Sequence, residues 1–444
     1  MSERIKNIIV QGSIPEFEND GDDLDRIYLP VRGVQTATSF AGDNLNRPLV
    51  VLPDTSEVKV FVSQTEQIFK EIGLRSSKSI LVPDTSYFLD LALEANLELL
   101  RDRLNVNNIH YLWQYANTHV SDGWVGRLRE EGFQINNALP KRGYLPHQTR
   151  SSWGRQIIKP DELSFPERWG ISYPISYIAK GEEQLLEAFE RITSLTGREN
   201  VWLKLSASAG GFGVMEVRSK NEALGFYKVA QENGSLFLFG DTRLEMDIEV
   251  QENIEGLVGF GSYQYNGETL ETPGGISIQV LDGKNWAGNK FNVLNGYLSK
   301  RAIEIHERFS KGMISEHPED FFGWGGIDLG IINNRDTPDL IVVENNWGRI
   351  TGAHPGIYFA RALGVSDRPF MVRKLNPPKV DAKECWKLLK EEKLAYEPLT
   401  KKGAIPIPWV ENVDAFIFVV GENENEILEI TDRIMNLTAQ NGYH

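Results

Sequence analysis

The chain has 444 residues, of which 41% are hydrophobic and 25% are charged. A single hydrophobic core stops growing at roughly 250–300 residues, so the sequence predicts a globular protein with more than one domain. The 47 Lys and Arg residues against 62 Asp and Glu residues give a formal charge of −15. An acidic balance opposes attraction to phosphate, which argues against nucleic acid or an acidic membrane as a partner.

The cysteine, histidine and apolar patterns argue against a disulfide-bonded, a membrane-spanning or a zinc-binding protein. Cys385 is the single cysteine, so no internal disulfide can form, and we expect a buried, inert thiol. No signal peptide is apparent, and no apolar run approaches the roughly 18 residues of a membrane-spanning helix, which predicts a cytoplasmic protein. The seven histidines lie outside any HExxH pattern, so any metal should be held by oxygen ligands.

The first part of the chain, residues 1–150, alternates β-rich runs with amphipathic segments. NIIVQG, RPLVVLP and SILVPD are typical of strands, and residues 56–73 and 86–105 are typical of helices. Such alternation predicts an α/β domain with an open sheet. The segment from Leu139 to Pro174 is rich in Pro, Gly and polar residues and indicates a boundary.

Residues 151–375 are predicted to form the second domain. A helix over 180–197 places Leu185, Leu186, Phe189 and Ile192 on one face. The run VWLKLS after it is typical of a strand. Farther on, a helix is expected over 299–313, and GWGGIDLGII with LIVVENN predicts a hairpin. Residues 376–444, with two helices around GAIPIPW and DAFIFVVG, are expected to form a small α+β appendage.

A loop of small residues follows the strand VWLKLS. SASAGGFGV lacks both a GxxxxGK[ST] pattern and a following helix, so it is neither a Walker-type loop nor a dinucleotide fingerprint. Small residues let backbone N–H groups approach phosphate oxygens, and Lys204 stands just before the loop as a cation. The alternative is an ordinary Gly-rich hairpin beside a solvated edge lysine.

Three oxygen-bearing side chains lie on the predicted hairpin. Alternation places Glu344 and Asn346 on one face, and hairpin pairing would bring Asp328 opposite them. Carboxylate and amide oxygens suit Mg²⁺, which commonly bridges to phosphates. Arg349 could neutralise a phosphoryl group or an oxyanion. The alternatives are polar residues that end strands and a surface salt bridge for Arg349.

The ordered series VWLKLSASAGGFGV, EVQENIEG, GGIDLG and VVENNWGRITGAHP resembles the ATP-grasp superfamily of carboxylate–amine ligases. The resemblance implies an ATP-grasp fold behind an amino-terminal pre-grasp domain, with a nucleotide-covering part at about 170–250 and a metal-binding part at about 251–375. It implies Mg²⁺ on Asp328, Glu344 and Asn346, and Arg349 as the catalytic residue. The nucleotide-binding residues that it implies are Lys159, Lys204, Ser206, Ser208, Gly210, Gly211, Gly213, Gln251, Glu252, Ile254 and Glu255.

The carboxyl-terminal part narrows the resemblance. The run GAHPG and the tail resemble peptide ligases of the pheganomycin type, although the family often has an arginine where this chain has Gly348. The resemblance implies ATP and Mg²⁺ as cofactors and small-molecule carboxylate and amine or peptide substrates, with a homodimer left open. A small-molecule kinase on the same fold and a non-catalytic ATP-binding protein are the alternatives.

Overall fold

The computed structural model forms two compact units, and each is discontinuous in sequence. The first comprises Met1–Leu139, Pro273–Leu294 and Ile350–His444, and the second comprises Pro140–Thr272 and Asn295–Arg349. The structure describes residues 8–11, 49–53, 56–74, 78–82, 94–104, 107–113, 119–137, 153–159, 161–205, 214–232, 247–254, 257–265, 270–271, 276–282, 285–294, 296–318, 323–332, 339–346, 353–375, 381–407, 409 and 415–440. The predicted domain boundaries at 150 and 375 remain predictions.

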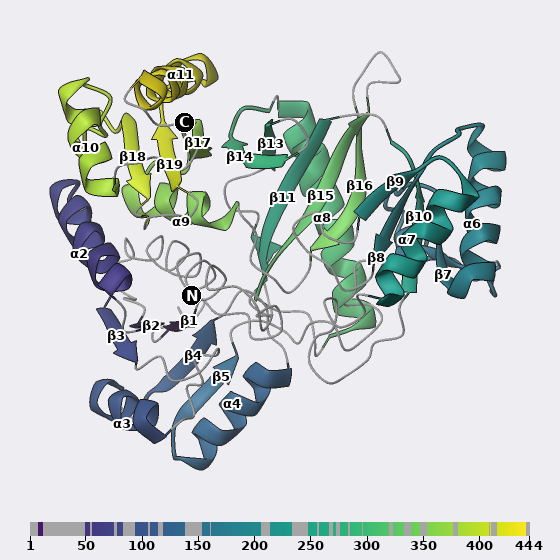
Figure 1. Ribbon diagram of the computed structural model, residues 1–444, viewed down its shortest axis with the longest axis horizontal. Coiled ribbons are helices and arrows are strands. Elements are labelled where there is room, and N and C mark those ends of the chain that lie inside the picture. The colour runs from purple at the N-terminus through teal and green to yellow at the C-terminus, as the bar shows by residue number, and fades with distance from the viewer. Residues whose placement is uncertain are drawn as a thin grey trace. The chain divides into compact units, whose positions relative to one another are not determined.

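A parallel sheet in the first unit confirms the predicted open α/β arrangement. Its strands, in spatial order β3-β2-β1-β4-β5, are Lys78–Val82, Leu49–Pro53, Ile8–Gln11, Ile109–Trp113 and Gln134–Asn137. The helices between them are α2 (Ser56–Glu71), α3 (Glu94–Arg103) and α4 (His119–Glu130) (Figure 1). Parallel strands need such crossover connections, and apolar residues of α3, α4 and β4 share one core.

An antiparallel sheet in the same unit includes the carboxyl-terminal strands. Its order is β13 (Ile276–Asp282), β14 (Asn285–Phe291), β17 (Phe370–Leu375), β19 (Ala415–Val420) and β18 (Gly403–Ile407). The helices of this region are α9 (His354–Leu363), α10 (Ala382–Glu391) and α11 (Glu424–Gln440). The tail is α+β, as predicted, and its strands extend the sheet formed by the earlier ones.

Gly288 allows β14 and β17 to approach closely. Its φ is +147°, and a Cβ atom at this position would lie 2.0 Å from the carbonyl oxygen of Val372. Nearby, the rings of Phe291 and Phe370 stack with their centroids 4.4 Å apart. A residue without a side chain is therefore required at the point where the two strands meet.

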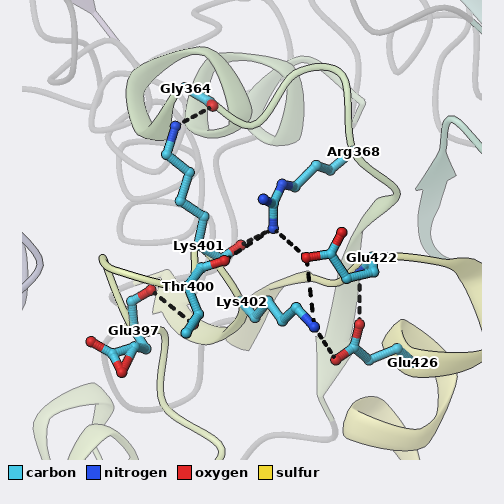
Figure 2. A network of polar contacts seen from close by, with 8 residues as sticks. All are labelled: Gly364, Arg368, Glu397, Thr400, Lys401, Lys402, Glu422 and Glu426. Atoms are coloured by element: carbon cyan, nitrogen blue, oxygen red, sulfur yellow. Dashed lines mark hydrogen bonds and ion pairs between the residues drawn. The ribbon is translucent and has the colours of Figure 1, made fainter.

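A network of charges joins the ends of the elements in the tail (Figure 2). Arg368 Nη1 donates to the carbonyl oxygens of Thr400 and Lys401 at 3.0 and 3.3 Å and to Glu422 at 3.0 Å. Lys402 Nζ lies 3.6 Å from the Glu422 carboxylate and 3.2 Å from that of Glu426. One guanidinium thus satisfies two backbone carbonyls and one carboxylate.

Helix α2 packs on helix α10 within the first unit. Glu71 Oε2 accepts hydrogen bonds from Trp386 Nε1 at 2.8 Å and from Lys390 Nζ at 2.7 Å. The Lys390 ammonium, with help from Trp386, lowers the pKa of Glu71. An edge-to-face contact between Phe69 and Phe359, with centroids 5.6 Å apart, adds apolar packing.

The second unit begins with a mainly antiparallel sheet. Its order is β6 (Arg155–Gln156), β7 (Ser176–Lys180), β10 (Asp247–Glu252), β8 (Val201–Leu205) and β9 (Val214–Val217). Helices α6 (Gly181–Thr196) and α7 (Lys220–Glu232) pack against it (Figure 1). Leu185, Phe189 and Ile192 are buried as predicted, whereas Leu186 on the predicted face is half-buried. Gly197, with φ +66°, caps the end of α6.

The remaining elements of the second unit confirm the predicted hairpin. Strand β15 (Gly323–Ile332) pairs with β16 (Asp339–Asn346) on one side and with β11 (Leu257–Tyr265) on the other, and β12 (Leu270–Glu271) pairs with β11. Helix α8 (Gly296–Glu316) lies where the sequence predicts it, with the short helix α5 (Phe165–Arg168) in the same unit. None of the helices in the ranges given above is long and apolar enough to cross a membrane.

Candidate functional site

Lys204 links the two segments in which the sequence predicts phosphate and metal binding. It lies on β8 and is only 6% exposed, so the solvated edge lysine is excluded. Its Nζ donates to the carbonyl oxygen of Val343 on β16 at 2.8 Å. Val343 immediately precedes Glu344, so a buried cation lies next to β16, the strand that carries the predicted Mg²⁺ ligands Glu344 and Asn346.

A β-bulge makes the Val343 carbonyl available to side chains. In the antiparallel pair β15–β16, Asp328 is opposite Glu344 and Leu329 is opposite Val342, so the register skips Val343. A bulged residue leaves the ladder of backbone hydrogen bonds. The freed oxygen accepts from Lys204 and, at 3.2 Å, from Nε2 of Gln251.

Two carboxylates face each other across this hairpin, as predicted. Asp328 and Glu344 are directly opposite residues on β15 and β16, and Glu344 is 8% exposed. Asn346 is opposite Gly326. Within the ranges that the structure describes, no group of three or more His, Cys, Asp and Glu residues forms a metal cluster. The facing pair offers hard oxygen ligands of the kind that suit Mg²⁺ when phosphates complete its shell.

Strand β10 contributes a buried glutamate to the same face as Lys204. Glu249 is directly opposite Lys204 in the β8–β10 pair and has no exposed surface. Its Oε1 accepts from the Tyr173 hydroxyl at 2.8 Å and from Gln251 Nε2 at 3.4 Å. These residues come from β8, β10 and the segment before β7, and all belong to the second unit.

Burial and neighbouring charges shift the pKa values of Glu249 and Tyr173. Burial raises the pKa of Glu249, and the Lys204 ammonium and the Tyr173 hydroxyl partly oppose that rise. Burial, followed by the negative charge of Glu249, raises the pKa of Tyr173 well above its ordinary value. Glu344 acts on both residues through its charge, so the carboxylate of the predicted metal strand lies within electrostatic reach of the cluster.

Glu252 and Lys159 lie in other surroundings. Glu252 Oε2 accepts from the backbone N–H of Ile175 at 3.3 Å, and its Oε1 lies 3.8 Å from Arg198 Nε, so its side chain fastens β10 to neighbouring segments. Lys159 Nζ lies 3.2 Å from Glu162, and the lysine side chain is 60% exposed.

Of the remaining candidate site residues, the structure describes two, Ile254 and Asn346. Ile254, just after β10, is half-buried, and Asn346 is described through its backbone. The candidate residues outside the described ranges are Ser206, Ser208, Gly210, Gly211, Gly213, Glu255 and Arg349. Their assigned roles remain predictions.

Sequence reasoning missed Glu249, Tyr173 and the Val343 carbonyl. The alternation in DIEVQE already places Glu249 on the face of Gln251, and a carboxylate in the middle of a buried strand is an unusual feature that could have identified it. Tyr173, which precedes Pro174 in a polar connector, carries no comparable signal. The Val343 carbonyl depends on a bulge that the sequence pattern does not show.

Several solved structures share this architecture over nearly their whole length. Biotin carboxylase from Campylobacter jejuni in a βγ-ATP complex is 12% identical, with a TM-score of 0.57, and the match covers 98% of this chain and 95% of that one. Phosphoribosylamine–glycine ligase from Thermotoga maritima is 12% identical, with a TM-score of 0.56 and 96% of both chains covered. Carboxyaminoimidazole ribonucleotide synthase from Aspergillus clavatus complexed with ATP is 10% identical, with a TM-score of 0.52, and 99% of this chain and 100% of that one are covered.

These structures are ATP-grasp proteins. The chain has the ATP-grasp fold. No protein-family model and no curated protein sequence matches it. Within this fold, Lys204 connects two parts of the second unit through its hydrogen bond to Val343. One part is the sheet that contains β8 and β10, and the other is the hairpin β15–β16. The predicted fold class is confirmed, and at this level of sequence identity the likeness concerns the fold alone.

Proposed function

We propose that the protein is an ATP-dependent ligase that joins a carboxylate to an amine through an acyl phosphate. The observation that carries the proposal is the 2.8 Å hydrogen bond from buried Lys204 to the Val343 carbonyl, which places a cation beside Glu344. A triphosphate with Mg²⁺ requires a cation and carboxylates together. Structural neighbours include a synthase complexed with ATP and a phosphoribosylamine–glycine ligase, which supports this reading.

In this proposal ATP lies along the face of β8 and β10 that carries Lys204. The Lys204 ammonium contacts phosphate oxygens, and backbone N–H groups of Ser206, Ser208, Gly210, Gly211 and Gly213 cover them. The adenine lies against Gln251 and the backbone near Ile254, and Glu252 and Glu255 lie at the ribose end. Lys159 is a second phosphate ligand.

Asp328 and Glu344 fit Mg²⁺ because they are facing carboxylates on neighbouring strands. Asn346 is the third protein ligand in this proposal. Mg²⁺ commonly uses one or two carboxylates and takes its other ligands from phosphates and water, so the described pair is sufficient. When bound, the ion would neutralise charge on the phosphate oxygens.

The proposed ligation consists of two successive displacements. A carboxylate oxygen of the substrate attacks the γ-phosphorus, the bond to the β-phosphate oxygen breaks, and ADP leaves. An amine nitrogen then attacks the acyl carbon, phosphate leaves, and the nitrogen loses one proton. Positioning and charge neutralisation supply most of the acceleration in such chemistry. Arg349 would stabilise the phosphoryl group or the tetrahedral intermediate.

We infer that the carboxylate is an amino acid or a similar acid and that the amine is an amino acid or a peptide. This narrower assignment is supported by the GAHPG run and by the tail, which resemble the pheganomycin-type peptide ligases. The assignment remains separate from the ATP chemistry, since acceptor pockets on one fold vary with their loops.

The test is ADP release from Mg-ATP in the presence of pooled amino acids and short peptides, with mass spectrometry of the products. A product with the mass of two components less one water is expected, and it names both substrates. A single component that gains a phosphate would overturn ligation in favour of a kinase. ATP binding without ADP release in any pool would overturn catalysis.

A further inference from the structure

We propose that Glu249 is the counter-charge of Lys204 and makes tight nucleotide binding depend on Mg²⁺. The inference rests on the proposed ATP site and concerns which charge state of the nucleotide that site accepts. Glu249 has no exposed surface and lies directly opposite Lys204 in the β8–β10 pair, and Lys204 is itself only 6% exposed. A buried carboxylate therefore shares one strand pair with the proposed phosphate-binding lysine.

Hydrogen bonds connect the two charged groups through one amide. Lys204 Nζ donates to the Val343 carbonyl oxygen at 2.8 Å. Gln251 Nε2 donates to the same oxygen at 3.2 Å and to Glu249 Oε1 at 3.4 Å. The Tyr173 hydroxyl also donates to Glu249 Oε1, at 2.8 Å. Two donors on one oxygen suit a carboxylate, and a cation on the opposite residue offsets the cost of burying its charge.

The Glu249 carboxylate weakens the positive potential that Lys204 offers to a phosphate group. Charges interact over several ångströms where the dielectric constant is low, so a ligand that contacts the lysine also interacts with the carboxylate behind it. Salt screens buried charges much less than exposed ones. Lys204 can therefore hold a phosphate oxygen by a hydrogen bond while the pair adds little net positive charge to the site.

The neighbouring hairpin adds negative charge to the same region. Asp328 and Glu344 are opposite each other on β15 and β16, and Glu344 is 8% exposed. Free ATP is more negatively charged than Mg-ATP, so these carboxylates repel it more strongly unless a cation is bound between them. Since Glu249 already balances Lys204, the charges of these residues favour the nucleotide that brings its metal.

The experiment measures the dissociation constant of ATP by calorimetry, once with Mg²⁺ and once with EDTA, for wild type and Glu249→Gln. Coulomb energy scales with the charge of the ligand, so the substitution should tighten binding of metal-free ATP by about tenfold and of Mg-ATP by about threefold or less. Glu249→Met, which also removes the charge, is the second variant and should shift the ratio of the two constants in the same direction. Circular dichroism and thermal unfolding establish that each variant is folded.

Two comparisons separate the role of Glu249 from a change in overall charge. Glu187→Gln removes one negative charge from α6, where Glu187 is 47% exposed and pairs with Arg191 at 2.8 Å, and should leave both dissociation constants near those of wild type. Lys204→Met leaves Glu249 without the cation opposite it, and burial then favours the uncharged acid. Adding Glu249→Gln to Lys204→Met should therefore leave the affinity for metal-free ATP unchanged.

The outcomes distinguish this inference from the function on which it rests. Wild-type protein that binds ATP neither with Mg²⁺ nor with EDTA overturns the proposed function and the inference with it. Wild-type protein that binds ATP equally well in both buffers, or Glu249 variants that keep the wild-type ratio, overturn only the role of Glu249. Tighter binding of metal-free ATP that persists in the Lys204→Met background also overturns it, because Glu249 would then act without the lysine. A lower ratio that requires Lys204 supports it.

Discussion

Lys204 and Gln251 donate hydrogen bonds to the same carbonyl oxygen, that of Val343, at 2.8 and 3.2 Å. Two strands that are adjacent in one sheet, β8 and β10, are thereby tied to the bulge in β16. Since the bulged residue lies next to Glu344, the Lys204 ammonium stands beside the strand that carries this carboxylate. The first two predictions follow from this junction.

Lys204→Met should lower the rate of ADP release from Mg-ATP by about a hundredfold, because a desolvated cation at a transferring phosphate is lost. The variant also leaves buried Glu249 without the cation opposite it. Lys228→Met, on the exposed side of α7, is the matched control and should behave as wild type. Unchanged kinetics in the Lys204 variant would remove the lysine from the phosphate site.

Glu344→Gln should lower the rate of ADP release by about a hundredfold and raise the Mg²⁺ concentration needed for half-maximal release, because one of two facing carboxylates loses its charge. The measurement is a Mg²⁺ titration at fixed ATP. Asp339→Asn, at the other end of β16, removes a carboxylate that pairs with Arg301 at 3.1 Å and should keep the wild-type Mg²⁺ dependence. Full turnover in the Glu344 variant would contradict the metal assignment.

Arg368→Ala should destabilise the protein by about 1–2 kcal/mol, because two backbone carbonyls and Glu422 lose a charged donor. Urea unfolding measures the change. Lys387→Ala removes an exposed ion pair with Glu391 on α10 and should cost no more than about 0.5 kcal/mol. Equal effects of the two substitutions would show that the network in Figure 2 adds nothing beyond surface charge.

The Arg155–Glu167 pair should make stability depend on pH in the acid range. Hydrogen bonds from Arg155 lower the pKa of Glu167 to about 2, from an ordinary value of 4.5. Because the folded pKa is the lower one, the contribution is complete above pH 4.5 and is lost as the pH falls toward 2. The side chains are 39% and 33% exposed, so solvent screening limits the effect to about 0.5–1 kcal/mol.

The measurement compares the free energies of unfolding of wild type and Glu167→Gln at pH 7 and at pH 3. The difference should shrink to under about half at pH 3, since the carboxylate then contributes less. Arg155→Gln removes the other partner and should show the same trend. A difference that is independent of pH would contradict the lowered pKa of Glu167.

Cys385 should resist alkylation in the native protein. The side chain is 4% exposed, and burial raises the pKa of its thiol to about 12, so the reactive thiolate is scarce at pH 8. Iodoacetamide followed by mass spectrometry should give no adduct in native buffer and one adduct in urea. Rapid modification of the folded protein would contradict the packing of α10.

Local sequence patterns determined individual helices and strands and one half of the candidate site, the facing carboxylates Asp328 and Glu344. Alternation in LIVVENN and the polar turn NNRDTPD before it predict the β15–β16 hairpin. Hairpin pairing sets Asp328 opposite Glu344 because the residues are close in sequence. The apolar spacing in 180–197 likewise predicts α6 and its buried face. Such features depend on neighbours along the chain, which the sequence displays directly.

Only the tertiary structure decided how the β15–β16 hairpin meets Lys204 and the sheet that contains β8 and β10. Lys204 and Val343 are 139 residues apart, and only packing in the second unit brings the ammonium to the bulged carbonyl. Packing also buried Glu249 and set its neighbours, and it placed the carboxyl-terminal strand β19 beside β17 in a sheet with β14. Contacts between distant segments depend on which surfaces bury each other, and no periodicity in one segment records its partner.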